Sequence, residues 1–222
     1  MDREYMAAVQ AYTRLLAQRN KILKEQVPDP SLLEVLDARM AAHAGRIYAG
    51  REELARQLQP VVAHYYRLIS GGAEEVAIGY KSDLAQATLQ DVFASHRERD
   101  LAMGYTTAGV QRGDFLFSMN GHPIRRAGSQ GQQKSFLVAL KFAQYEIMKR
   151  RYGFAPMLLL DDVFDKLDLG RISHLIGMVA GADFGQIFIT DTDAARLSSI
   201  VDRLTEDRAY FTAAGGAFER NA

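Results

Sequence analysis

Two adjacent carboxylates, Asp161 and Asp162, follow an apolar run at residues 157–160. An apolar run without alternation is typical of a strand that is buried on both faces of a parallel sheet. Ligands of open α/β sheets bind just outside the carboxyl ends of the strands. One carboxylate at such an end can hold Mg²⁺ beside a phosphate chain, and its neighbour can orient an attacking water. The sequence therefore predicts phosphate chemistry at this strand end.

A second candidate site is a small polar turn before a long amphipathic run. Ser129 and Gln132 have the spacing of a capping box, with the serine as the cap of the helix. The backbone amides of Gln130, Gly131 and Gln132 would then point out of the positive end of the helix. Such an end suits a phosphate group. On the residues alone, a capped helix and a strand-end Asp pair in an ordinary α/β domain explain the same pattern.

The order of these features resembles a known family. The text GSQGQQKSFLVALKFAQYE at residues 128–146, followed by LLLDDVFDKLD at 158–168, is similar to the RecF family of SMC-like ABC ATPases. In that family the three parts are the signature motif, the Walker B strand and the D-loop. The resemblance covers nearly all of the chain, but only the later part of a RecF sequence. It implies an α/β fold: a partial lobe of an ABC-ATPase-like P-loop NTPase, with an inserted helical, coiled-coil-like arm.

The resemblance also implies roles for single residues. Two subunits would sandwich ATP, with Ser129, Gly131 and Gln132 reaching the γ-phosphate of the other subunit. Asp161 would hold Mg²⁺ and Asp162 would help to activate water. Asp168 would lie across the dimer interface. Thr190 stands at the switch position, where RecF-like chains show Thr and Asp instead of His.

The function implied by the resemblance is an ATP-dependent clamp on DNA. RecF proteins act in recombinational repair and replication restart. They load RecA at gaps and forks with RecO and RecR, and they take part in the SOS response. We expect sequence-independent binding to single-stranded and double-stranded DNA junctions, and an ATP-dependent homodimer of the complete protein.

Composition limits the class of protein. The 222 residues include no cysteine, which excludes disulfides and cysteine-based metal sites, and 48% are hydrophobic, enough for a core. The start is not signal-like and no apolar stretch is long enough to span a bilayer, so we expect a cytoplasmic protein without membrane partners. The net charge is zero, but residues 157–222 carry 11 acidic and 6 basic side chains. The excess of bases before residue 157 permits a side that faces nucleic acid.

The first part of the chain has a helical pattern. Residues 3–26 and 32–69 show apolar side chains at helical spacing, and the two prolines at 28 and 30 separate them. Pro60 predicts a kink or break in the second helix. A short strand at 76–80 and a helix at 85–103 follow. We expect a helical arm domain at 1–105.

The later part of the chain changes character. Asn120-Gly121 between two short apolar segments predicts a β-hairpin at 114–126. A helix is expected at 171–179, a second buried strand at 186–190, and a last strand at 210–212. The polar tail after Gly215-Gly216 is expected to be frayed. We expect residues 106–222 to form the C-terminal part of the ABC-type lobe.

Several bases are candidates for DNA contacts. A basic side chain binds phosphates without any base-reading motif. The alternative is a solvated helix face, which explains most charge runs. The candidates are Arg14, Arg19, Lys21, Arg112, Arg125 and Arg126.

The Walker A motif is missing from the chain. No Gly-x-x-x-x-Gly-Lys-Ser/Thr occurs in the sequence, and a nucleotide site needs that lysine and its loop. The chain is therefore interpreted as a fragment, a truncated form or a gene remnant. RecF proteins are weak ATPases, and we expect this chain to be inactive alone, with ATP and Mg²⁺ bound only in the complete protein.

Two other classes of function stay open. The chain can be a non-catalytic interaction module whose arm binds DNA or a partner, with the motif region as scaffold. It can also be a Mg²⁺-dependent phosphohydrolase or nuclease that uses Asp161, Asp162 and Asp165. The second alternative needs a further acidic or histidine ligand at the site.

Overall fold

The structure, a computed structural model, describes residues 2–72, 74–164, 167–181 and 184–221. The chain divides into two compact units, each formed by two separate segments. Unit 1 consists of Met1–Pro60 and Val76–Arg126, and unit 2 of Val61–Glu75 and Ala127–Ala222. The expected division, with an arm at 1–105 and an ATPase lobe at 106–222, stays a prediction. The contacts group residues 106–126 with the arm helices.

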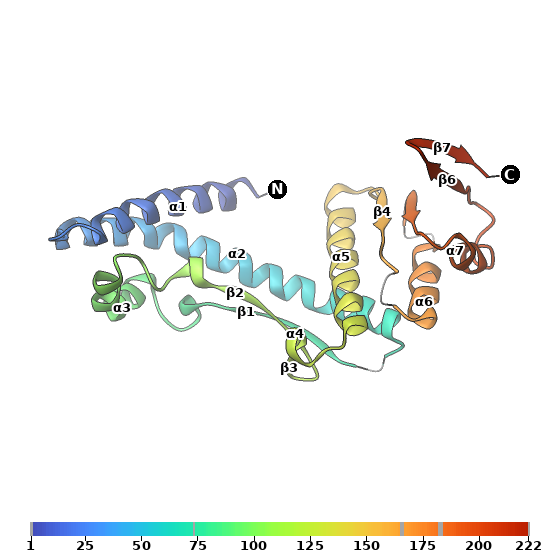
Figure 1. The fold of residues 1–222 in the computed structure, drawn as a ribbon. Helices are drawn as coiled ribbons and strands as arrows, with labels where there is room; N and C mark the ends of the chain where they lie inside the picture. Colours follow the sequence, from blue (N-terminus) through green and yellow to red (C-terminus); the bar gives the residue numbers. More distant parts are fainter. Residues whose placement is uncertain (1, 73, 165–166, 182–183, 222) are drawn as a thin grey trace. The chain divides into compact units, whose positions relative to one another are not determined.

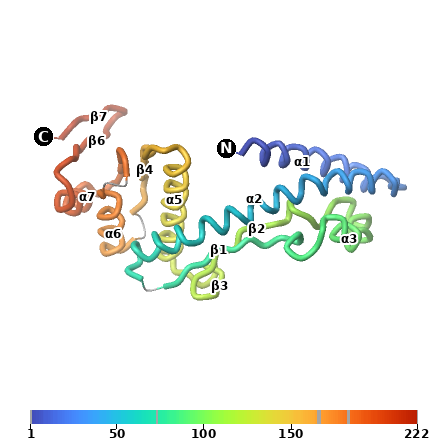
Figure 2. The backbone as a smooth tube through the Cα atoms, turned by 180° about the vertical axis from the view of Figure 1, so that it is seen from behind, coloured from blue at the N-terminus to red at the C-terminus, as the bar shows by residue number. Residues whose placement is uncertain are grey.

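Unit 1 is built on two long helices (Figure 1). Helix α1 spans Arg3–Leu23 and helix α2 begins at Pro30, and both views show α1 lying along the first part of α2 (Figure 2). The other elements of this unit are a 3₁₀ turn η1 at Asp83–Ala85, helix α3 at Leu89–Met103, a 3₁₀ turn η2 at Val110–Arg112, and the strands β1 (Val76–Lys81), β2 (Asp114–Met119) and β3 (His122–Pro123). One core joins α1, α2 and α3, with Tyr12, Met40 and Phe93 among its buried members. This core packs the three predicted helices against one another.

Helix α2 continues through Pro60 without a break. It runs over 41 residues, Pro30–Ser70, with Pro60 inside it, and so contributes to both units. The break that we allowed for at Pro60 does not occur. Pro60 is exposed, so its ring lies in solvent and the missing N–H removes one helical hydrogen bond without burying an unpaired group.

The predicted hairpin is confirmed for residues 114–123, whereas residues 124–126 are helical, and the hairpin is part of a larger sheet. Asn120 and Gly121 have φ of 48° and 79°, the left-handed conformations that a tight two-residue turn requires. Strand β2 pairs antiparallel with β3 on one side and with β1 on the other, Val76 lying opposite Met119. The β1–β2 pairing joins segments about 40 residues apart in the sequence, and no local pattern indicated it.

Unit 2 holds the elements that carry the motifs. The short helix α4 (Ile124–Ala127) leads from unit 1 into this unit. The other elements are α5 (Gln130–Tyr152), β4 (Leu158–Asp161), α6 (Leu169–Val179), β5 (Ile187–Thr190), α7 (Ala194–Val201), β6 (Phe211–Ala214) and β7 (Ala217–Arg220). Aromatic rings join the end of α2 to α5: Tyr65 lies 5.5 Å from Phe142 and Tyr66 lies 6.4 Å from Phe136.

The two predicted strands of the lobe lie in one sheet. Strands β4 and β5 pair in parallel, with Leu159 opposite Phe188 and Asp161 opposite Thr190. The expected burial of β4 on both faces does not hold in this chain, because Leu159 is 68% exposed and Phe188 is 48% exposed. Leu159 and Phe188 are neighbours in the ladder and lie on one face, which among the described residues is largely open to solvent.

The C-terminal segment is ordered, which corrects the expectation of a frayed tail. Strands β6 and β7 form an antiparallel hairpin around Gly215-Gly216, whose φ angles are 58° and 81°. These left-handed glycines form the turn between the two strands, at the position from which a frayed tail was expected. None of the described helices is both long and apolar enough to cross a membrane.

Candidate functional site

The strand-end carboxylates are held by the neighbouring strand. Because Asp161 lies opposite Thr190 in the parallel ladder, the Thr190 hydroxyl donates to Asp161 Oδ1 at 2.5 Å. The same hydroxyl accepts from the Asp162 N–H at 3.3 Å. Both carboxylates are exposed at the end of β4. Thr190, expected at the switch position, thus orders the pair directly.

The turn after β4 is also attached to helix α5. Asp162 has φ of 48°, a left-handed conformation that is uncommon for residues other than glycine. Its carbonyl oxygen accepts from Lys134 Nζ at 3.1 Å. Lys134 lies two residues after Gln132 in the first turns of α5, so it connects the two motif regions. This role of Lys134 was not predicted from the sequence, although the lysine lies only two residues beyond the signature-like turn.

The predicted capping box at the start of α5 is present. The Ser129 Oγ accepts from the Gln132 N–H at 3.2 Å, and Gln132 Oε1 accepts from the Ser129 N–H at 2.7 Å. The amides of Gln130 and Gly131 lie in the first turn of the helix, where the backbone has no helical acceptor for them. This end is therefore able to bind an anion. Gln132 Nε2, however, donates to Glu74 at 2.7 Å, so that side chain is already engaged within the protein.

The D-loop candidate Asp168 is the cap of helix α6. Its Oδ1 accepts from the Arg171 N–H at 3.0 Å, and its Oδ2 lies 3.2 Å from Arg171 Nε. The carboxylate is 68% exposed, so its oxygens can also accept hydrogen bonds from solvent or from another molecule. An exposed acidic group at a helix start can still meet a second molecule.

The residues after Thr190 form an internal ion pair. Arg196 Nη2 donates to both carboxylate oxygens of Asp191, at 2.7 Å and 2.8 Å. Burial acts to raise the pKa of Asp191, but the Asp193 N–H and Arg196 outweigh it, and the pKa lies below its ordinary value. Asp191 is therefore a charged structural residue that orients the start of α7.

The end of strand β4 offers one carboxylate, Asp161, as a ligand for a metal ion. Magnesium prefers oxygen ligands and is commonly held by one or two carboxylates together with substrate phosphates. The exposed Asp161 fits that requirement as a single ligand. Within the described residues, no group of three or more His, Asp or Glu side chains converges on a metal position. Asp165, which the phosphohydrolase alternative used, lies outside the described residues.

An apolar groove of about 470 Å³ lies beside the same strand. Helix α5 forms one wall and residues 156–163 form the other. Leu159, Met157 and Leu137 line it and are 68%, 58% and 49% exposed. Lys134 and Asp161 lie on its border, so the groove adjoins the carboxylate pair.

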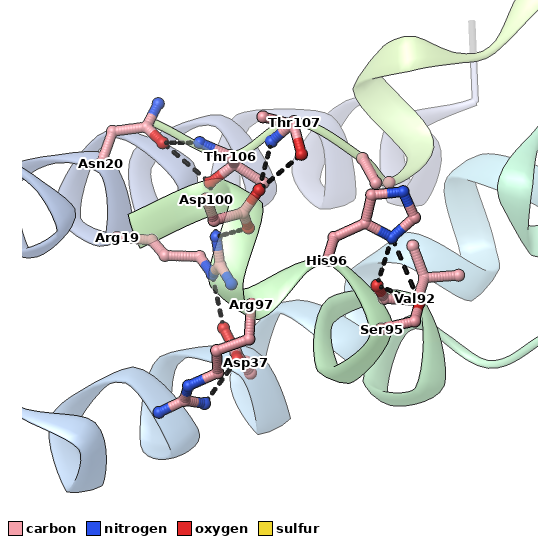
Figure 3. A network of polar contacts seen from close by, with 12 residues as sticks. Arg19, Asn20, Asp37, Val92, Ser95, His96, Arg97, Asp100, Thr106 and Thr107 are labelled. Carbon is pink, nitrogen blue, oxygen red and sulfur yellow. Dashed lines mark hydrogen bonds and ion pairs between the residues drawn. The ribbon is translucent and has the colours of Figure 1, made fainter. Parts of the chain in front are cut away.

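The candidate DNA-binding bases fall into two groups. Arg14, Lys21, Arg125 and Arg126 are exposed, and the exposed Arg112 guanidinium lies 5.8 Å from the centre of the Tyr105 ring. Arg19 is only 1% exposed and forms ion pairs with Asp37 and Asp100, both at 2.7 Å (Figure 3). Its selection as a DNA contact was wrong, because its charge is neutralised inside unit 1.

Comparison with known proteins gives a consistent result. No protein-family model matches the chain. The chain is 41% identical over 210 residues to the DNA replication and repair protein RecF of Parabacteroides distasonis, covering 95% of this chain and 58% of the relative. It is 40% identical to RecF of Bacteroides thetaiotaomicron, with 95% and 57% covered.

Solved structures show the same similarity. A structure of the recombination mediator protein RecF with ATP, in the RecFOR pathway, superposes with a TM-score of 0.76 at 26% sequence identity. The match covers all of this chain and 60% of that one. It confirms the expected fold class, part of an ABC-type ATPase lobe with a helical arm. The chain is therefore homologous to the RecF proteins over nearly its whole length, and it spans a little under three fifths of theirs.

Proposed function

We propose that this chain supplies the signature turn and the Walker B strand end of a RecF-like, ATP-dependent DNA clamp. The observation that carries the proposal is the connection of the two motif regions. The capped start of α5 and the Asp161-Asp162 turn are joined by the Lys134 Nζ bond to the Asp162 carbonyl. A shared frame of this kind would hold the two motif regions at a fixed spacing, as a dimer requires in which each region meets a different one of two bound nucleotides.

The signature turn is prepared for a phosphate group. Because Ser129 Oγ accepts from the Gln132 N–H, its own proton is left to donate to a phosphate oxygen. The first-turn amides at Gln130 and Gly131 add donors, and the positive end of a helix of 23 residues adds a favourable field. These groups would reach the γ-phosphate held by a second subunit, so that ATP closes a homodimer.

The strand end would act on the nucleotide of its own subunit. Bound there, Mg²⁺ would neutralise charge on the phosphate oxygens. Asp161, oriented by Thr190, is the residue that would hold the ion, and the adjacent Asp162 carboxylate would orient a water molecule. Asp168 would face the partner subunit across the interface. The expected activity is a weak ATPase that needs the part of RecF that this chain does not cover.

The DNA and protein partners follow from the RecF relatives. The exposed bases Arg14, Lys21, Arg112, Arg125 and Arg126 would neutralise backbone phosphates without reading base sequence. We extend the RecFOR connection of the solved relative to this chain: RecO and RecR as partners, RecA loading at gaps, a part in the SOS response, and a place in the cytoplasm.

The test uses this chain joined to the part of the Parabacteroides RecF that it does not cover, called here the complemented protein. The proposal expects ATP-dependent dimers of the complemented protein in analytical ultracentrifugation, and DNA binding that weakens as salt rises. The matched control is the same protein with Ser129→Arg. Dimers that form equally well with this arginine, or without ATP, would contradict the proposal.

A further inference from the structure

Arg171 connects the candidate site residues of unit 2. All three of its guanidinium nitrogens are engaged: Nη1 donates to Ser135 Oγ at 2.7 Å, Nη2 lies 3.7 Å from Glu74, and Nε lies 3.2 Å from Asp168. The fork of the guanidinium makes such a threefold connection possible, and a lysine ammonium cannot reproduce its geometry.

The contacts of Arg171 lead back to the signature turn by two routes. Ser135 is completely buried, and its hydroxyl donates to the Gly131 carbonyl at 2.8 Å. Glu74 accepts from Nε2 of the Gln132 side chain, and Oε1 of the same side chain accepts from the Ser129 N–H. Both ends of the Gln132 amide are therefore used inside the protein. The Gln132 side chain therefore holds the turn in place. The groups that remain to bind a phosphate are the backbone amides and the Ser129 hydroxyl.

The ion pair between Glu74 and Arg171 is largely buried, which strengthens the interaction. The side chains of Glu74 and Arg171 are only 12% and 17% exposed, so solvent screens them less than a surface pair. Tyr66 adds a further bond by donating to Glu74 Oε2 at 3.3 Å. Buried polar networks in which each member has a partner hold a single geometry.

We propose that Glu74 and Arg171 are a positioning pair that fixes the signature turn relative to Asp168. The proposal rests on the function proposed above, since it makes the turn and Asp168 parts of one surface for the partner's nucleotide. Neither residue touches nucleotide; both act through Gln132, Ser135 and Asp168. Glu74 lies in the sequence between α2 and β1, so the pair also connects the turn with the end of the arm helix.

The first test is amide hydrogen exchange of this chain, measured by mass spectrometry. In Arg171→Met and in Glu74→Gln, peptides covering 128–136 should exchange about tenfold faster, since a lost charge-assisted bond weakens local order by about that factor. The double variant should exchange no faster than the quicker single variant, because the two residues share one connection. Arg150→Met is the matched control, since Arg150 is 68% exposed and pairs with Glu146 along its own helix.

Two results would overturn the positioning role at this stage. One is an unchanged exchange rate at 128–136 in folded Arg171→Met. The other is an equal acceleration in every peptide of unit 2, which would indicate general destabilisation. If Arg171→Met fails to fold, Glu74→Gln carries the test, since it keeps the shape and hydrogen-bonding groups of the side chain.

The second test uses the complemented protein. Arg171→Met should weaken the ATP-driven dimer about tenfold while the ATP affinity of each subunit stays unchanged, and Arg171→Lys should recover only part of the loss. An unchanged dimer would overturn the role even if exchange had changed. The exchange experiment involves no ATP, so its failure is distinct from a failure of the proposed ATP-dependent function, which would abolish the dimer of the unsubstituted protein as well.

Discussion

Arg19 shows how a charged side chain can be a core residue. Its Nη1 donates to Asp100 at 2.7 Å and to Thr106 Oγ1 at 2.8 Å, and the guanidinium lies 4.1 Å from the centre of the Phe93 ring. Asp100 also accepts from the N–H and hydroxyl of Thr107. Each buried charge therefore has both an ion-pair partner and hydrogen bonds, which offsets the loss of hydration.

Removing this arginine should strongly destabilise unit 1. In Arg19→Met, Asp100 would stay buried without its cation, and Asp37 would keep its 3.9 Å contact with Arg97 but lose its 2.7 Å pair; breaking a buried pair in this way costs about 3–5 kcal/mol. The free energy of unfolding, measured by urea denaturation, should fall by that order. Arg46→Met is the control: Arg46 is 49% exposed in its pair with Asp2 and should change stability by less than about 1 kcal/mol. Equal effects of the two substitutions would contradict the buried network.

Tyr66 provides a prediction for alkaline pH. Burial, together with the nearby Glu74 charge, raises the pKa of its hydroxyl from 10.0 to about 12. A raised pKa means that the folded state holds the proton more tightly than the unfolded state. The resulting stability is complete below pH 10 and is lost as the pH rises toward 12. Urea denaturation of Tyr66→Phe should show a shallower decline over this window than the unsubstituted chain. Parallel declines would show that Tyr66 titrates alike in both states.

At the scale of elements, local signals predicted the structure well where the partners are close in sequence. Ser129 and Gln132 are three residues apart, and their capping box forms as expected. Asn120-Gly121 formed its turn for the same reason, because the backbone conformation depends on those two residues alone.

Longer-range features could not be predicted in this way. Gln132 meets Glu74 across 58 residues, and β1 meets β2 through a pairing that no local pattern marks. The burial of Arg19 is indicated by its spacing in the sequence. The residue lies four positions after Leu15 and three before Ile22, on the buried face of α1. That spacing outweighs the polar character of the residue, and the solvated-face interpretation of charge runs overlooked it.

Because α2 continues through Pro60, we expect replacement of this proline to stabilise the chain. Proline inside a helix costs about 3 kcal/mol relative to alanine, because it removes an N–H and crowds the preceding turn. Pro60 is exposed, so Pro60→Ala removes little packing. We expect the substitution to stabilise the chain by up to that amount and to raise Tm in thermal unfolding followed by circular dichroism. A lower Tm would show that the proline stabilises a bend on which the packing depends.

At the scale of the whole molecule, one face of the β4–β5 sheet in unit 2 is largely open to solvent among the described residues. A parallel pair of strands is normally covered on both faces, yet β4 and β5 leave Leu159 and Phe188 open beside the apolar groove. The RecF relatives have about two fifths of their length without a counterpart here. We expect that part to cover this face and to bring the phosphate-binding lysine and loop to Asp161.

Nucleotide binding should depend on that completion. The signature turn offers a helix end worth about 0.3–1 kcal/mol at an exposed site. Micromolar binding needs about 8 kcal/mol, so the helix end alone falls far short. Isothermal titration calorimetry should detect no ATP binding to this chain alone and clear binding to the complemented protein. Micromolar binding to the chain alone would show that its own residues form a sufficient site.

Two substitutions in the complemented protein separate the roles of the turn and the strand end. Ser129→Arg places a long side chain where the partner's γ-phosphate would lie, so ATP-driven dimers should disappear while each subunit still binds ATP. Asp162→Asn keeps the left-handed turn, which asparagine tolerates, but removes the charge that would orient water. Hydrolysis should slow by about 10²-fold or more, and the dimer should persist longer after ATP is added. Sedimentation with and without ATP, together with single-turnover hydrolysis, distinguishes the two effects. Loss of ATP binding to the single subunit in Ser129→Arg would place the turn in the subunit's own site instead of the partner's.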